Sequence, residues 1–149
     1  SALIARMGHE DTQFSHLAVV YVDPRTKKAW TIEAHIELGS VIAPLDQWLS
    51  DGKSRTLVFR HEDADLAHRA ALHSYTRVKT RQDAGDVIKY DFAFDMHNHD
   101  RLFCSEVARE GYEAASRGAL RVPAFPSQLT MKNRDLMDRL GIGEDQSFI

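Results

Sequence analysis

Hydrophobic and polar residues alternate most regularly over residues 30–37 (WTIEAHIE), where every second side chain is apolar. A period of two predicts a β-strand with one apolar and one polar face. We therefore expect Trp30 and Ile32 to lie in the core. On the opposite face of the same strand, Glu33 and His35 are expected to line a cleft.

A second strand is predicted just upstream, over residues 15–23 (SHLAVVYVD), which are rich in β-branched residues and end in the turn signal Asp-Pro. The basic segment PRTKK separates the two predicted strands. A short polar segment of this kind indicates a turn, so we expect the two strands to form a hairpin. Alternation along the first strand places His16 on the same face as Val20 and Val22.

The rest of the chain predicts three more strands and four helices. The strands are expected at residues 39–44, 55–60 (RTLVFR) and 90–95 (YDFAFD). The helices are expected at residues 45–49, 63–81, 102–116 and, in the tail, 133–140. Strands mixed with segregated helices are typical of the α+β class. A length of 149 residues and a mass of 16.9 kDa suit a single domain, residues 1–149.

Composition and charge exclude several classes of protein. The 19 Lys and Arg residues against 22 Asp and Glu residues give a formal net charge of −3, which argues against a nucleic-acid-binding surface. No apolar run approaches the roughly 18 residues of a membrane-spanning helix, so no span is expected. Residues 1–6 (SALIAR) lack the long apolar stretch of a secretory signal, and we expect a trimmed chain. The compartment is therefore left open.

Cys104 is the single cysteine of the chain, which excludes an internal disulfide. It lies where the segment YDFAFDMHNHD gives way to the predicted 102–116 helix. The dipole and the free N–H groups of a helix start favour the nucleophilic thiolate, and those N–H groups could hold an oxyanion during acyl transfer. The alternative is a buried structural cysteine that acts as a small hydrophobic residue. Both interpretations stay open at this point.

A nucleophilic cysteine needs a base, most often a histidine held by a third polar group. Of the eight histidines, His16 stands out because it begins an otherwise apolar strand. The predicted hairpin would bring Glu33 beside it, where the carboxylate could orient the ring and stabilise the imidazolium. His35 lies on the same predicted face as Glu33 and is a rival for the third position. Each residue alone is also consistent with an ordinary polar side chain on a strand.

The run from His97 to Asp100 (HNHD) raises the question of a metal site. Two histidines and a carboxylate suit zinc, but no second well-spaced pair of ligands accompanies them, and a solvated loop leading into the Cys104 helix is favoured. The sequence contains no Gly-rich phosphate loop and no dinucleotide-binding fingerprint. We therefore expect neither a metal nor an organic cofactor.

Four segments carry a resemblance to a known family: residues 14–20 (FSHLAVV), 31–34 (TIEA), 90–95 (YDFAFD) and 103–106 (FCSE). Together they resemble the permuted NlpC-type, papain-like cysteine hydrolases, in particular the YiiX/YebB-like branch, with lecithin:retinol acyltransferase-like proteins as more distant relatives. In these permuted enzymes the histidine precedes the cysteine along the chain, as it does here. The resemblance spans about residues 3–118. It implies Cys104 as nucleophile, His16 as general base and Glu33 as the residue that orients it.

The resemblance implies an α+β, papain-like fold in which an antiparallel sheet packs against the helix of the nucleophile. It also implies a cysteine hydrolase of the peptidase or amidase type, which cleaves an amide or ester through an acyl-enzyme. A small peptide, a cell-wall muropeptide or a lipid acyl group would be the substrate, and the cell envelope or periplasm would be a compatible location. The alternatives are an acyltransferase or lipid-ester hydrolase of the same fold, and a non-catalytic binding domain.

Two departures from the family pattern are visible. The Gly-Asp-aliphatic segment that opens the first strand of the family is represented here only by residues 1–6, and the tail beyond Gly118 matches none of its motifs. The oligomeric state is not indicated by the sequence.

Overall fold

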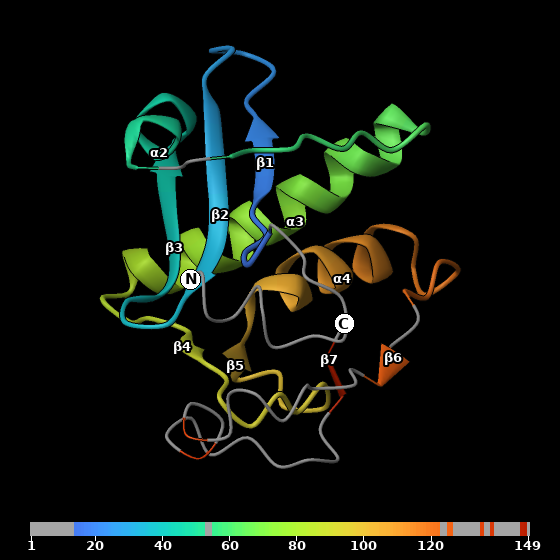
Figure 1. Cartoon of the computed structure of the whole chain (residues 1–149). Coiled ribbons are helices and arrows are strands. Elements are labelled where there is room, and N and C mark those ends of the chain that lie inside the picture. Colours follow the sequence, from blue (N-terminus) through green and yellow to red (C-terminus); the bar gives the residue numbers. More distant parts are fainter. Residues whose placement is uncertain are drawn as a thin grey trace.

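The computed structural model describes residues 14–52, 55–122, 125–126 and 147–148, together with the single residues 135 and 138. Its centre is a three-stranded antiparallel sheet in the order β1-β2-β3 (Figure 1). The strands are β1 (Val19–Val22), β2 (Ala29–His35) and β3 (Gly39–Pro44). Strand β2 lies in the middle, so both of its edges are hydrogen-bonded within the sheet.

The turn between β1 and β2 is shaped by the side chain of Asp23. Its oxygen Oδ1 accepts the backbone N–H groups of Arg25 at 2.8 Å and Thr26 at 3.4 Å. Lys27 completes the turn in the left-handed region, with φ of 59°. Aspartate commonly closes turns in this way. The resulting register puts Val19 opposite Ile32, and this register sets the geometry of the candidate site.

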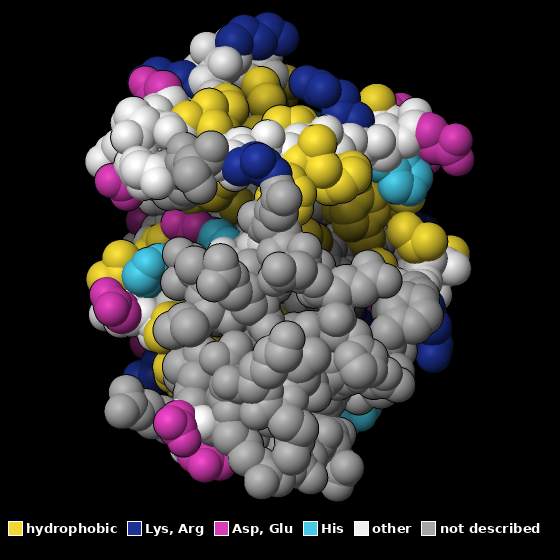
Figure 2. Space-filling model, viewed as in Figure 1, with side chains coloured by type: hydrophobic (Ala, Val, Ile, Leu, Met, Phe, Trp, Pro, Cys, Tyr) yellow, Lys and Arg dark blue, Asp and Glu magenta, His cyan; other side chains and the backbone are white. Residues whose placement is uncertain are grey.

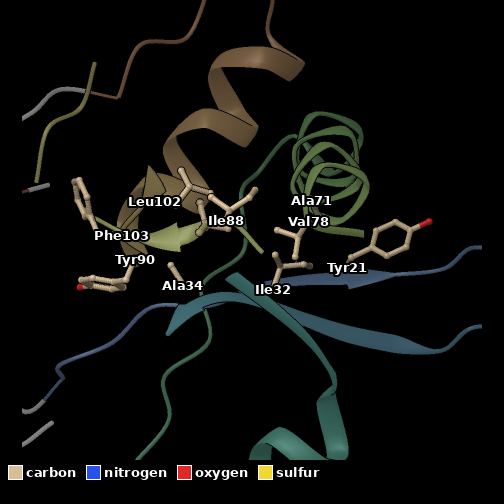
Figure 3. Close-up of a cluster of buried hydrophobic side chains, with 10 residues drawn as sticks. Tyr21, Ile32, Ala34, Ala71, Val78, Ile88, Tyr90, Leu102 and Phe103 are labelled. Atoms are coloured by element: carbon tan, nitrogen blue, oxygen red, sulfur yellow. The ribbon is translucent and has the colours of Figure 1, made fainter. Parts of the chain in front are cut away.

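Three helices accompany the sheet: α2 (Leu45–Ser50), α3 (Ala64–Asp83) and α4 (Cys104–Ala115). The start of α3 is capped by Asp63, whose carboxylate accepts the N–H of Leu66 at 2.8 Å. Helix α3 lies across one face of the sheet, and α2 lies on the opposite side (Figures 1 and 3). Two short pairs complete the description: β4 (Lys89–Tyr90) runs parallel to β5 (Arg101–Leu102), and β6 (Phe125–Pro126) runs antiparallel to β7 (Ser147–Phe148).

The hydrophobic core lies between the α3 face of the sheet and the two long helices (Figure 3). Its buried residues are Tyr21, Ile32, Ala34, Ala71, Val78, Ile88, Tyr90, Leu102, Phe103 and Val107. Ile32 from β2 is fully buried, and Trp30 packs partly buried against the cluster. Both residues are therefore where the alternation predicts them to be.

Helices α3 and α4 cross at small residues. A Cβ atom added to Gly111 of α4 would lie 2.7 Å from Oγ of Ser74 and 2.8 Å from the carbonyl oxygen of Ala70, both in α3. The Ser74 hydroxyl donates to the carbonyl of Val107 at 2.9 Å, which ties the two helices together. This close approach holds the helix that begins at Cys104 firmly against the rest of the fold.

The α+β class, the hairpin, the 39–44 strand and the two long helices are confirmed. The predicted 15–23 strand is regular only over β1, from Val19 to Val22. The predicted 102–116 helix begins at Cys104, because Leu102 is taken up by pairing with Tyr90. Of the helix predicted at 133–140, only Asp135 and Asp138 are described, and both are helical; residues 1–6 lie outside the described residues.

Two strand predictions are wrong. Residues 55–60 form no regular structure and are exposed throughout, because an apolar run becomes a strand only where another strand pairs with it. The predicted 90–95 strand stops after Tyr90. The carboxylate of Asp91 accepts the N–H groups of Ala93 at 3.0 Å and Asp95 at 2.8 Å, which turns the chain away from the sheet direction. Among the described helices, none is long and apolar enough to cross a membrane.

Candidate active site

The hairpin brings His16 and Glu33 together. Because Val19 lies opposite Ile32, the chain just before β1 runs past Glu33 on the neighbouring strand. The ring nitrogen Nε2 of His16 lies 2.6 Å from Oε2 of Glu33, although 17 residues separate them in the sequence. Alternation in β2 directs Glu33 away from α3, so this contact forms on the α2 side of the sheet.

Glu33 is only 8% exposed, and a buried carboxylate must be satisfied by donors. Its second donor is Trp48 of α2, whose indole Nε1–H reaches the same oxygen, Oε2, at 2.9 Å. Helix α2 follows directly on β3, which pairs with β2 so that Val41 lies opposite Glu33. The register of the sheet therefore places both Trp48 and His16 beside the Glu33 carboxylate.

Cys104 is the first residue of α4 and is half-buried. The start of the helix is fixed by the residues around it. The backbone N–H of Phe103 donates to Oε2 of Glu106 at 3.1 Å, and the N–H of Glu106 donates to the carbonyl oxygen of Phe103 at 3.1 Å. Phe103 is 2% exposed and Glu106 is 1% exposed. These contacts anchor the backbone on both sides of the sulfur.

The charge state of His16 reflects its two neighbours. Burial alone would lower the pKa of the ring, but hydrogen bonds to Cys104 and Glu33, and the negative charges of those groups, outweigh it and raise the pKa of His16 to about 9. The imidazolium is thus the favoured form at neutral pH. A cationic ring between a sulfur and a carboxylate is the arrangement that a thiolate–imidazolium pair requires.

A second carboxyl group lies beneath the start of α4. Burial raises the pKa of Glu106 to about 7, an effect that the nearby charge of Asp91 reinforces and the Phe103 N–H, Arg109 and Arg77 oppose. Burial also raises the pKa of the Tyr90 hydroxyl above its ordinary range, helped by the charges of Cys104, Asp91 and Glu106. The underside of the Cys104 helix is therefore an environment that disfavours additional negative charge.

The structure brings His16 within 2.6 Å of Glu33, and Cys104 is among the groups that raise the pKa of the His16 ring. The rival, His35, is engaged elsewhere, since its Nδ1 accepts the N–H of Glu37 at 3.2 Å. Trp48 was not predicted. Its position on a short helix directly after a strand that pairs with the Glu33 strand is the signal that could have indicated it.

In the HNHD loop, His99 is held by hydrogen bonds and ion pairs with other side chains of the protein. Nδ1 of His99 lies 2.9 Å from Oε1 of Glu110, which is also paired with Arg77, and Arg77 donates to the carbonyl of His99. Within residues 14–52 and 55–122 and the few others described, no group of three or more His, Cys, Asp or Glu side chains is placed to hold a metal ion. The loop lies between β4 and β5, and β5 leads directly into α4.

The antiparallel sheet and the helix that begins at Cys104 and packs against it have the papain-like fold. The sequence matches the family of permuted papain-like amidases, described as YaeF/YiiX, C92 family, over residues 4–140. The chain therefore belongs to that family, which bears out the resemblance noted in its motifs.

Among solved structures, the chain is similar to yiiX from Escherichia coli O157:H7, described as a metalloprotein. The TM-score is 0.58 at 20% sequence identity, and the match covers 100% of this chain and 80% of that chain. At this identity the likeness shows the fold. The comparison with curated proteins gave no match.

Proposed function

We propose that the protein is a cysteine hydrolase that cleaves an amide or ester bond through an acyl-enzyme. Cys104 is the nucleophile, His16 the general base and acid, and Glu33 the residue that orients His16. The observation that carries this proposal is the contact of His16 with Glu33 at 2.6 Å, supported by the influence of Cys104 on the pKa of the same ring. Membership of an amidase family supports the same reaction class.

In the proposed reaction, Nε2–H of His16 donates to Glu33, and Nδ1 holds the proton taken from the thiol, so that the pair rests as imidazolium and thiolate. The sulfur of Cys104 then attacks the substrate carbonyl carbon, and the carbonyl electrons move to the oxygen. A helix leaves the N–H groups of its first turn without intrahelical partners, and those at the start of α4 are the proposed donors to this oxyanion. His16 passes its proton to the leaving amine or alcohol as the bond breaks, and water then releases the acyl group.

The family suggests an amide as the scissile bond, and cell-wall peptides are the substrates that we propose first. Two other readings predict different outcomes with the same protein. An acyltransferase or lipid-ester hydrolase would form the same acyl-enzyme from a lipid acyl donor. A non-catalytic binding domain would form no acyl-enzyme.

The test is the rate of alkylation of Cys104 by iodoacetamide as a function of pH, which needs no known substrate. A thiolate held by the imidazolium of His16 reacts rapidly near neutral pH, because the ring keeps its proton up to about pH 9. His16→Ala removes the cation, so the reactive limb of the profile should move upward in pH. Glu33→Gln keeps a hydrogen-bonding group and should give a smaller shift than His16→Ala.

His35→Ala is the matched control, since His35 lies on the same strand as Glu33 and is engaged with Glu37. A crippling effect of His35→Ala with a harmless Glu33→Gln would reassign the third position. A native thiol that reacts no faster than free cysteine, with a profile unchanged in His16→Ala, would overturn the nucleophile assignment. Mass spectrometry of the protein after incubation with muropeptides, acyl-lysines and phospholipid esters then identifies which donor forms the acyl-enzyme.

A further inference from the structure

The outer surface of the hairpin carries large hydrophobic side chains that the core does not use. Tyr21 turns toward α3, where its ring stacks on Tyr75 with centroids 4.7 Å apart. Alternation then directs Val20 and Val22 to the opposite face of the sheet, and they are 42% and 45% exposed. His16 belongs to this same side of the sheet, because it contacts Glu33, which points away from α3.

The segment that joins α2 to α3 adds to this surface. It carries three consecutive exposed residues, Leu57, Val58 and Phe59, with exposed fractions of 56%, 62% and 84%. In Figure 1 the segment passes in front of β2 and β1, on the side away from α3, and Figure 2 shows hydrophobic side chains gathered at that place. We call Val20, Val22 and residues 57–59 the apolar surface.

Contiguous exposed apolar surface on a protein commonly marks an interaction site. Exposed apolar residues alone would suit a dimer interface, a peptide-binding surface or a membrane-binding surface equally well. The charged residues around the apolar surface therefore distinguish between these partners. Arg55 and Arg60 flank the three hydrophobic residues directly, and all of residues 55–60 are exposed.

The β1–β2 turn adds further cations. Arg25, Lys27 and Lys28 are exposed there, and the nearby Asp23 is occupied with the N–H groups of its own turn. Two acidic residues, Glu62 and Asp63, follow Arg60 along the chain, and the Asp63 carboxylate is occupied with the N–H of Leu66 at the start of α3. These two segments are thus cationic in a chain whose net charge is −3.

We propose that the apolar surface docks on an anionic lipid bilayer. Hydrophobic side chains that enter the headgroup region, surrounded by Arg and Lys, are the features by which a peripheral protein binds such a surface. Because the apolar surface and His16 belong to the same side of the hairpin, docking would hold the candidate site close to the membrane. The proposal concerns binding and does not depend on turnover.

The experiment is sedimentation of the full 149-residue chain with phosphatidylcholine vesicles that contain or lack phosphatidylglycerol. We expect binding to the anionic vesicles that weakens in high salt. Leu57→Ser combined with Phe59→Ser should reduce the binding constant by about tenfold or more, because it removes two buried apolar contacts. Arg55→Gln combined with Arg60→Gln should reduce it by about fivefold per arginine.

Leu38→Ser is the matched control. Leu38 is 61% exposed, close to the 56% of Leu57, but lies in the turn between β2 and β3 at the other end of the strands. It should bind like the unaltered chain. Absence of binding to anionic vesicles, or equal binding by Leu57→Ser/Phe59→Ser, would overturn the proposal. A third outcome would also overturn it: the unaltered chain binds no vesicles and forms a dimer that Leu57→Ser dissociates. The surface would then be an interface between two copies of the chain.

Discussion

The two faces of the β1-β2-β3 sheet are built for different purposes. On the α3 face, Tyr21, Ile32 and Ala34 are buried in contact with other apolar side chains. On the α2 face the same strand β2 buries polar groups, Thr31 and Glu33. The difference teaches that burial alone does not identify the core of this protein. The core side chains on one face hold the fold together, and the other face holds the charged groups Glu33 and His16 in contact.

The polar face can be buried because its groups are satisfied. Oγ1 of Thr31 donates to the carbonyl of Ala43 at 3.1 Å, and Glu33 accepts from Trp48. Burying such groups without partners would cost on the order of 1–3 kcal/mol each. A buried carboxylate with its donors in place instead acts as a fixed negative charge beside His16. This is the physical reason that α2 belongs to the site.

Ile32→Ala is expected to show most clearly that the α3 face determines stability and the α2 face determines the reactivity of Cys104. Ile32 is fully buried, and truncation of its side chain leaves a cavity under α3. We expect a loss of about 2–5 kcal/mol in the free energy of unfolding. The alkylation rate of Cys104 in the folded protein should stay close to that of the unaltered chain. Urea denaturation and iodoacetamide kinetics below the transition measure the two quantities.

Glu33→Gln is the variant on the opposite face of β2 with which Ile32→Ala is compared. It should shift the alkylation profile while changing the stability much less than Ile32→Ala does. If Ile32→Ala slowed alkylation in the folded protein as strongly as Glu33→Gln, the two faces would not be separable.

The alternation of residues 30–37 predicted that Ile32 and Glu33 lie on opposite faces of β2. The predicted hairpin added the contact of His16 with Glu33, because its two strands lie side by side. The same reasoning fails for residues 55–60. Thr56, Val58 and Phe59 favour a strand locally, but strand formation requires a partner strand, and only the tertiary structure decides whether one is present. Asp91 likewise ends β4 through hydrogen bonds of its own side chain. Trp48 depends on how α2 is placed after β3, which no local pattern specifies.

A second prediction concerns the carboxyl group beneath the Cys104 helix. The pKa of Glu106 is raised to about 7 in the folded state, above its value of 4.5 in an unfolded chain. The folded protein therefore holds this proton more tightly, and the resulting stability is complete below pH 4.5 and is lost as the pH rises through 7. Glu106→Gln removes the titration and keeps an oxygen for the Phe103 N–H. We expect a flatter dependence of the unfolding free energy on pH, by up to about 1.4 kcal/mol per pH unit in that window.

Urea denaturation at several pH values between 4.5 and 8 measures this slope. Glu113→Gln is the control, because Glu113 lies on the same helix, is half-buried and pairs with Arg109 near the surface. It should leave the slope nearly unchanged. An identical slope for Glu106→Gln and the unaltered chain would show that Glu106 titrates normally in the fold.

The smallest effect is expected from Trp48→Phe, for which the chain offers its own control in its second tryptophan. Trp48 donates to Glu33 on the α2 face, and Trp30 packs on the α3 face with its ring 6.4 Å from that of Tyr75. Loss of the indole donor removes one hydrogen bond to a charged group, about 1.5–3 kcal/mol at most, and relaxation will recover part of it. We expect Trp48→Phe to slow alkylation of Cys104 several-fold near neutral pH.

Trp30→Phe should lower the unfolding free energy without slowing alkylation. Because Trp48 acts through Glu33, its substitution should have no further effect in a Glu33→Gln background, and a double-mutant cycle on the alkylation rate measures this coupling. If the two substitutions were additive, Trp48 would influence the thiol by a route other than Glu33. If Trp30→Phe slowed alkylation as much as Trp48→Phe, the slower rate would result from a general destabilisation of the sheet. Helix α2 would then have no specific role in the candidate site.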